Sequence, residues 1–141
     1  MDREILFRAK RVCNDEWIEG YYLNCYYPGN STDQTGHFIV EYPGKYHEIY
    51  LDTLCQYIGL TDKNGRKIFE GDILHFVNHS YNNKWLCVVE FLKGSFICRY
   101  IHKDGVLGER IHFNSWHAKV RWEVIGNIID NSDLVKHYME G

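Results

Sequence analysis

The chain has 141 residues, about the size of one domain, and its 45% hydrophobic and 25% charged residues are typical of a globular protein, which excludes a largely disordered chain. The formal net charge of −3, with acidic and basic residues interspersed, gives no global field that would attract a nucleic acid or an anionic membrane. No apolar run approaches the ~20 residues that a membrane-spanning helix needs.

Strands are expected in the N-terminal part, because aromatic residues make up 16% of the chain and suit pleated, half-buried surfaces. Apolar stretches at 5–9 and 17–23, separated by a polar bend, predict a hairpin. Turn-forming residues fill 28–36 and predict a loop, after which 37–42 resumes a strand pattern. The stretch 47–55 fits either a strand or one turn of helix.

The C-terminal part begins with a tight turn. Asn64-Gly65 lies between the apolar stretches 57–60 and 67–69, and Asn-Gly is the pair that accepts positive φ at both central positions of a type I′ turn. Further strands are predicted in succession over 73–77, 85–91 and 95–101. A meander of this kind buries both of its edges most simply by curling into a small barrel.

Alternation is clearest between residues 116 and 122. Four apolar residues fall on one face of a predicted strand, Trp116, Ala118, Val120 and Trp122. Three basic or titratable residues fall on the other face, His117, Lys119 and Arg121. Arg99 would join this second face if the strand over 95–101 pairs with it. Basic side chains beside aromatic rings can hold a nucleic-acid backbone and stack bases, but a solvated face over a tryptophan-rich core is the favoured explanation of the pattern.

The chain is predicted to end in a buried strand and a short helix. In the strand 124–129, Gly126 would allow a bend or a close backbone approach. Asn131 or Ser132 can cap a helix over 133–139, which would dock on the barrel. We therefore expect two regions, a β-rich extension over residues 1–55 and a barrel with a C-terminal helix over residues 56–141.

The residues that could carry chemistry favour structural roles. The five cysteines include no CxxC pair and are expected to be reduced thiols packed in the core. Asp62, Glu70 and Asp72 lie at predicted turns, where aspartate accepts hydrogen bonds from nearby backbone N–H groups. Gly59, Gly65, Gly71 and Gly126 are interpreted as residues that set backbone geometry.

No enzyme, cofactor or metal site is predicted. His75 and His79 have the spacing of zinc ligands on a helix, but the predicted strand holds them too far apart. The phosphate-binding and nucleophile motifs GxGxxG, GxxxxGK[ST] and GxSxG are absent from the sequence. We therefore assign no catalytic, cofactor-binding or metal-binding residue, and a metal-dependent enzyme is the least favoured hypothesis.

Three segments resemble one known family. Gln56 to Ile73 (QYIGLTDKNGRKIFEGDI) is similar to the hallmark segment of the YopX family of phage and prophage proteins. Arg3 to Ala9 resembles the opening of those proteins, and Trp122 to Ile128 resembles their closing strand. The three segments stand in the order of the family and span nearly the whole chain.

The resemblance implies a mainly β fold with an SH3-like barrel in the C-terminal portion, and a phage or prophage product that acts in the bacterial cytoplasm. The start of the chain agrees with this location, because it lacks the features of a signal peptide. The family has no established biochemical function, so the resemblance implies no activity and no site residues.

Three functional hypotheses follow. The first is a non-enzymatic module that binds a host or phage protein, since tyrosine and tryptophan are enriched at interface hot spots. The second is weak nucleic-acid binding through Arg99, His117, Lys119 and Arg121. The third is the metal-dependent enzyme. Self-association through exposed strand edges is a separate expectation that the sequence leaves open.

Overall fold

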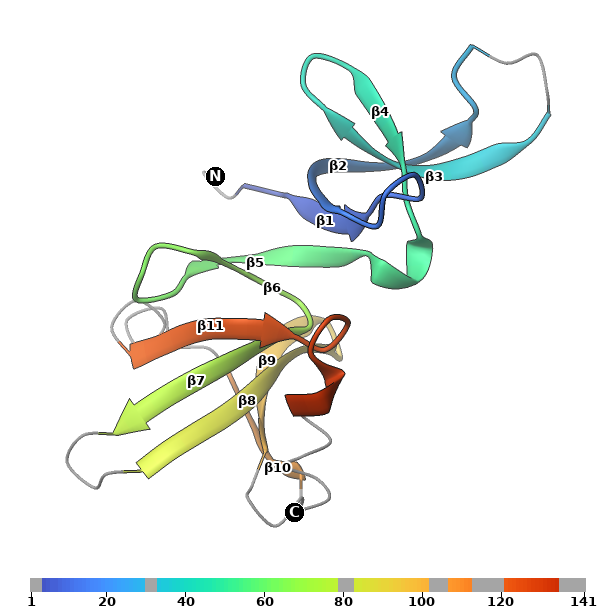
Figure 1. The fold of residues 1–141 in the computed structure, drawn as a ribbon. Helices are drawn as coiled ribbons and strands as arrows, with labels where there is room; N and C mark the ends of the chain where they lie inside the picture. Colours follow the sequence, from blue (N-terminus) through green and yellow to red (C-terminus); the bar gives the residue numbers. More distant parts are fainter. Residues whose placement is uncertain (1–3, 30–32, 79–82, 102–106, 113–120, 135–141) are drawn as a thin grey trace. The chain divides into compact units, whose positions relative to one another are not determined.

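The computed structural model describes residues 4–29, 33–78, 83–101, 107–112 and 121–134 (Figure 1). The chain is mainly β, as predicted, with two antiparallel sheets and little helix. It divides into two compact units, residues 1–57 and residues 58–141, and each is described by itself below. No helix in the described ranges is long and apolar enough to span a membrane.

The first unit is an antiparallel sheet in which neighbouring strands follow the order β4-β3-β2-β1-β5. Its strands are β1 (Phe7–Lys10), β2 (Trp17–Tyr26), β3 (Thr35–Glu41), β4 (Lys45–Glu48) and the beginning of β5 (Cys55–Thr61). The hairpin predicted from the first two apolar stretches is confirmed as β1 and β2. The ambiguous stretch 47–55 contains the end of β4 and a short 3-10 helix, η1 (Leu51–Thr53).

The core of the first unit lies on one face of this sheet. Ala9, Ile39 and Ile49 are buried there. Partly buried apolar side chains pack around them, namely Phe7, Ile18, Tyr22 and Leu54. Because side chains alternate along a strand, the neighbours of these residues in β2 and β3 point to the opposite face.

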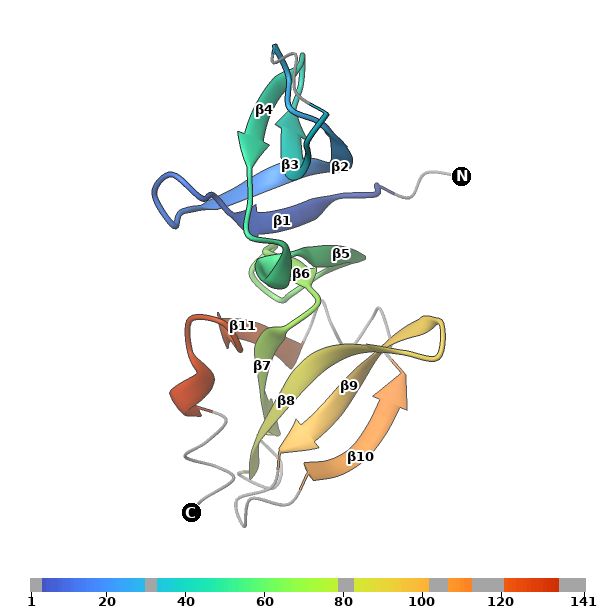
Figure 2. The same ribbon diagram turned by 90° about the vertical axis from the view of Figure 1, so that its right-hand side faces the viewer.

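The second unit contains a five-stranded antiparallel sheet in the order β10-β9-β8-β7-β11 (Figure 2). Its strands are β7 (Asp72–Asn78), β8 (Asn83–Leu92), β9 (Ser95–Ile101), β10 (Leu107–His112) and β11 (Trp122–Asn127). The rest of β5 and the short β6 (Lys67–Phe69) precede them. The predicted meander is confirmed, because β7 to β10 are consecutive neighbours and β11 returns to pair with β7.

The predicted closure into a barrel is not seen in the described part of this unit, where β10 and β11 are the edges of an open sheet. The sheet buries its two faces by packing other segments against them. Ile58, Leu60 and Ile68 pack with Leu74 and Trp122 on one face. Leu134 packs on a second cluster that contains Ile73, Leu86, Val88 and Ile101.

The end of the chain differs in part from the prediction. β11 begins at Trp122, and Arg121 is helical, so the strand predicted over 116–122 is wrong at Arg121 and its residues 116–120 lie outside the described ranges. Residues 132–134 are helical, and Leu134 docks on the sheet as expected. The remainder of the predicted helix, 135–139, lies outside the described ranges.

Gly126 confirms the prediction of a close backbone approach. The register of β11 against β7 shifts between Val124 and Gly126, which is the sign of a β-bulge. A Cβ atom on Gly126 would lie 2.5 Å from Oδ1 of Asn131, and this same oxygen accepts a hydrogen bond from the N–H of Asn127 at 3.1 Å. Glycine thus leaves room for the side chain that fixes the turn after β11.

Candidate functional site

The strand register of the first unit places a row of aromatic and apolar side chains on the face opposite its core. Tyr21 of β2 opposes Val40 of β3, which in turn opposes Tyr46 of β4. Leu23 opposes Phe38 in the neighbouring row. With Tyr27, which packs on Phe38, these side chains form what we call the outer aromatic face: Tyr21, Leu23, Tyr27, Phe38, Val40 and Tyr46.

Three members of the outer aromatic face are largely exposed. The exposed fractions are 63% for Tyr21, 40% for Leu23 and 42% for Tyr46. Phe38, by contrast, is only 4% exposed. The rings of Tyr27 and Tyr46 pack edge-on against Phe38, with centroid distances of 5.4 and 5.9 Å. A buried ring therefore holds its aromatic neighbours in place, which lowers the conformational entropy that they would lose on binding a partner.

Tyr27 is also held by a polar contact. Its hydroxyl donates a hydrogen bond of 2.8 Å to Oε1 of Glu48 in β4. This hydrogen bond, with partial burial and the negative charge of the same carboxylate, raises the pKa of the Tyr27 phenol above its ordinary value of 10.0. The neutral phenol is the form that makes the contact, so the contact is complete at neutral pH and is lost as the pH rises through the pKa of Tyr27.

This contact gives a titration prediction. Replacing Glu48 by glutamine removes the charge but keeps an acceptor, so the pKa of Tyr27 should fall toward 10.0. NMR titration of protein labelled at the tyrosine ring carbons measures this pKa directly. Glu19→Gln, on an exposed residue that does not contribute to the raised pKa of Tyr27, is the control and should leave the titration unchanged. An unchanged Tyr27 titration in the Glu48→Gln variant would contradict the assignment.

Two histidines of the first unit have protein partners. Nδ1 of His37 lies 2.6 Å from the hydroxyl of Tyr22, and the two rings stack with centroids 5.9 Å apart. Nε2 of His47, which is 5% exposed, lies 2.6 Å from Oε1 of Glu41. Among the described residues, no group of three or more His, Cys, Asp or Glu side chains is placed to hold a metal ion. These pairs are explained by packing and by hydrogen bonding of partly buried side chains.

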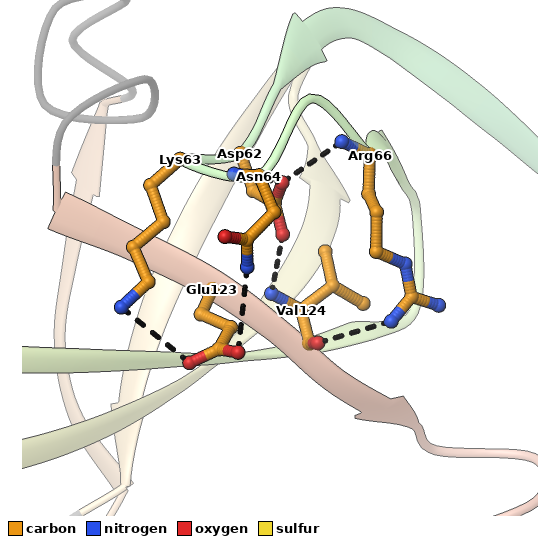
Figure 3. A network of polar contacts seen from close by, with 6 residues as sticks. All are labelled: Asp62, Lys63, Asn64, Arg66, Glu123 and Val124. Atoms are coloured by element: carbon orange, nitrogen blue, oxygen red, sulfur yellow. Dashed lines mark hydrogen bonds and ion pairs between the residues drawn. The ribbon is translucent and has the colours of Figure 1, made fainter.

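Asp62 has a structural role, as the sequence predicted (Figure 3). Its side chain accepts three backbone hydrogen bonds of 2.9 Å, from the N–H groups of Asn64 and Arg66 at Oδ1 and of Val124 at Oδ2. The residue is 2% exposed. The carboxylate therefore organises its own turn and ties that turn to β11.

Further contacts surround this attachment, and Figure 3 shows those of the Lys63, Asn64 and Arg66 side chains reaching Glu123 and Val124 of β11. Lys63 donates its backbone N–H to the carbonyl of Trp122 at 2.9 Å, and its ammonium group lies 3.6 Å from the Glu123 carboxylate. The guanidinium group of Arg66 donates a hydrogen bond of 3.4 Å to the carbonyl oxygen of Val124. The turn predicted at Asn64-Gly65 is thus the element on which β11, the last strand of the unit, docks.

The conformation of this turn differs from the predicted type I′. Gly65 has φ of +80°, whereas Asn64 does not have positive φ. The N–H of Gly65 bonds to the carbonyl of Asp62, and the N–H of Asp62 bonds to the carbonyl of Arg66. This pattern is a type I turn followed by a left-handed glycine. The side chain of Asp62 favours it, because the carboxylate accepts the N–H groups of Asn64 and Arg66 in that geometry.

Asp72 also has a structural role, as an acceptor for a backbone N–H group. It is fully buried and accepts a hydrogen bond of 2.8 Å from the N–H of Phe69. Gly71 has φ of +85° and bridges two segments, because its N–H bonds to Val89 and its carbonyl accepts the N–H of Ile128. The prediction that these residues fix turns is confirmed.

The predicted basic face is described only in part. His117 and Lys119 lie outside the described residues. Arg99 is half-buried on β9, on the face that carries Val88, and its guanidinium lies 3.5 Å from the Glu90 carboxylate. The guanidinium of Arg121 lies over the ring of Phe76, 5.8 Å from its centroid. Phe76 packs on the other face of the sheet, with Trp122. The structure therefore does not bring Arg99 and Arg121 to one face.

Comparisons with known proteins identify a family and a fold. The profile described as YopX protein matches residues 6–136 of the chain. A solved structure, the crystal structure of protein EF1440 from Enterococcus faecalis, is similar with 23% sequence identity and a TM-score of 0.55. That match covers 95% of this chain and 99% of the other. No protein with a curated description matches the chain.

Proposed function

The chain belongs to the YopX family, and we propose that it is a non-enzymatic interaction module, encoded by a phage or prophage, whose outer aromatic face binds a host or phage protein in the bacterial cytoplasm. The observation that carries this proposal is the exposure of Tyr21, Leu23 and Tyr46 on one side of a well-packed sheet.

Physical reasoning supports the choice of this face. Contiguous exposed apolar surface is unfavourable in water, and where it is found on a folded protein it often marks an interaction site. Tyrosine is enriched at interface hot spots because it buries a large area, loses little side-chain entropy and keeps one polar atom for a hydrogen bond. The two exposed tyrosines lie in the same row across β2, β3 and β4, so one partner surface can contact both.

A pair of matched variants tests the proposal. Tyr21→Ser with Tyr46→Ser removes both rings from the outer aromatic face. Tyr26→Ser is the control, because Tyr26 is 64% exposed but, by alternation along β2, points to the face opposite Tyr21. Each tagged protein is purified from phage-infected or prophage-induced cells, and the bound proteins are identified by mass spectrometry. Circular dichroism verifies that all three proteins are folded.

Wild type and the control should recover the same partner, whereas the Tyr21→Ser, Tyr46→Ser variant should recover at least about tenfold less of it, which corresponds to about 1.4 kcal/mol of binding free energy. Equal recovery by both variants would contradict the proposal. Failure of the wild-type chain to recover any specific partner in repeated experiments would count against it as well.

The second unit supports a different candidate function, weak nucleic-acid binding. Its support is the cation over an aromatic ring at Arg121 and Phe76, a combination that nucleic-acid-binding proteins use. We propose His117, Lys119 and Arg121 as the residues involved, on an SH3-like barrel that the meander of β7 to β10 and the returning β11 would form. Arg99 lies on the opposite face of the sheet from Phe76 and would not share their contact. Labelled oligonucleotides should bind at low salt and dissociate at moderate salt. No binding at low salt removes this alternative.

A further inference from the structure

Two cysteines of the second unit lie in direct contact. Cys87 is on β8 and Cys98 is on β9, and the register places Cys98 opposite Val89 and Cys87 opposite Tyr100. The two cysteines are therefore diagonal neighbours on the same face of the sheet. Their sulfur atoms are 3.2 Å apart, and both residues are free thiols.

The surroundings of this pair are apolar and closed. Cys87 and Cys98 are 0% and 1% exposed. They belong to the core cluster that also contains Leu74, Val89 and Trp122. The nearest polar partner of each sulfur is thus the other sulfur, with the Cys87 thiol as donor. The three other cysteines, Cys13, Cys25 and Cys55, belong to the first unit.

We propose that Cys87 and Cys98 are an oxidation site, at which a peroxide converts the two thiols into a disulfide between β8 and β9. The sulfurs lie 3.2 Å apart, about 1.2 Å beyond the S–S bond length of about 2.05 Å. Because diagonal neighbours in a sheet are about 7–8 Å apart, the bond also requires β8 and β9 to move slightly toward each other. When the sheet re-forms after one thiol has reacted, the pairing of β8 with β9 returns the second thiol to the first.

The chemistry balances with one peroxide. One thiol attacks hydrogen peroxide, the O–O bond breaks, and a sulfenic acid and one water form. The second thiol then attacks the sulfenic sulfur, the S–OH bond breaks, and the leaving hydroxide takes the proton of the second thiol to form another water. Two thiols are oxidised by two electrons in total, and one peroxide is reduced to two waters.

Burial should make this reaction slow in the folded protein. Burial and the contact with Cys98 raise the pKa of Cys87 well above its ordinary value, so little of the reactive thiolate is present at neutral pH. Cys13, which is exposed, should react first. Opening of the sheet would expose the two thiols. The disulfide that then forms would link β8 and β9, the two strands that the turn at Lys93 and Gly94 connects.

The test treats the full chain with hydrogen peroxide, both in buffer and in urea just below the unfolding midpoint, where opening is more frequent. Free thiols are then alkylated and the protein is digested without reduction for mass spectrometry. The expected product is a peptide pair joined through Cys87 and Cys98, lighter by two hydrogens. The linked protein should melt at a higher temperature than the reduced one, and dithiothreitol should reverse both changes.

Cys98→Ser and Cys98→Ala should abolish the linked peptide. Cys55→Ser is the matched control, because Cys55 is also buried but donates its S–H to the backbone carbonyl of Thr53. This variant should form the link like wild type. If Cys87 and Cys98 are recovered as separate sulfinic acids, as disulfides with other cysteines, or as free thiols after treatment in urea, the proposal is wrong. The peptides recovered from the wild-type protein test the proposal by themselves, even if the variants at Cys98 fail to fold.

Discussion

Replacing Asp62 by alanine is expected to destabilise the second unit by about 3–5 kcal/mol. The substitution removes the acceptor for three backbone N–H groups, and the N–H of Val124 lies in a buried hydrogen bond that water does not replace. Because a domain of this size is stable by about 5–15 kcal/mol, the loss is a large part of the total. Urea unfolding followed by tryptophan fluorescence measures it, since Trp122 is buried in the core of this unit.

Two further substitutions make this result specific to the buried carboxylate. Asp62→Asn keeps the shape and one acceptor oxygen, so its effect should lie between wild type and alanine. Glu123→Gln breaks the contact with Lys63, but both side chains are about 40% exposed, and such surface pairs contribute about 0–1 kcal/mol. If Asp62→Ala costs no more than Glu123→Gln, the buried network does not hold β11 in place.

Gly20→Ala should have the second largest effect, and it should be confined to the first unit. A Cβ atom at this position would lie 2.6 Å from the carbonyl oxygen of Val40 and 2.8 Å from Cγ2 of Ile39. The first of these atoms belongs to the backbone of β3, so β2 and β3 must move apart. Forcing an extra carbon into a packed region of this kind costs about 2–3 kcal/mol.

Hydrogen exchange followed by mass spectrometry resolves the effect by segment. Amides of β2 and β3 should exchange faster in Gly20→Ala, while those of β7 and β8 should exchange as in wild type. The neighbouring substitution Glu19→Ala, on an exposed side chain, is the control and should change neither. Unchanged exchange in β2 and β3 would show that the approach at Gly20 is not tight.

The sequence predicts the course of the fold well where patterns are local. The strands of the meander, the turn at Asn64-Gly65 and the structural role of Asp62 all follow from short stretches of sequence. The third hydrogen bond of Asp62 does not, because its donor, Val124, lies 62 residues further along the chain. The predicted turn type was wrong for a related reason. The hydrogen bonds that the Asp62 side chain accepts from the backbone determine the turn type, and the pair Asn64-Gly65 alone does not.

Other differences arise where the sequence pattern is weak. β10 was not predicted, because Leu107 to His112 does not alternate clearly and its register against β9 shifts between Leu107 and Arg110. Closure into a barrel was inferred from the general cost of exposed edges. The structure shows that packing of Ile68 and Leu134 on the two faces also buries the apolar side chains of an open sheet.

The candidate site was predicted poorly. Both faces of β2 carry tyrosines, Tyr21 and Tyr22, so alternation within that strand does not reveal which of them is exposed. Only the pairing of β2 with β3 and β4 places Tyr21 beside Val40 and Tyr46. The predicted basic face depended on a strand that would include Arg121, and that residue is helical in the structure.

The most direct test of the interaction module is hydrogen exchange of the chain alone and bound to the partner that wild type recovers. Slower exchange should appear in peptides of β2 and β4, which carry Tyr21, Leu23 and Tyr46, while β7 and β8 remain unchanged. Slower exchange in the second unit alone, with β2 and β4 unaffected, would contradict the assignment of the binding surface to the outer aromatic face.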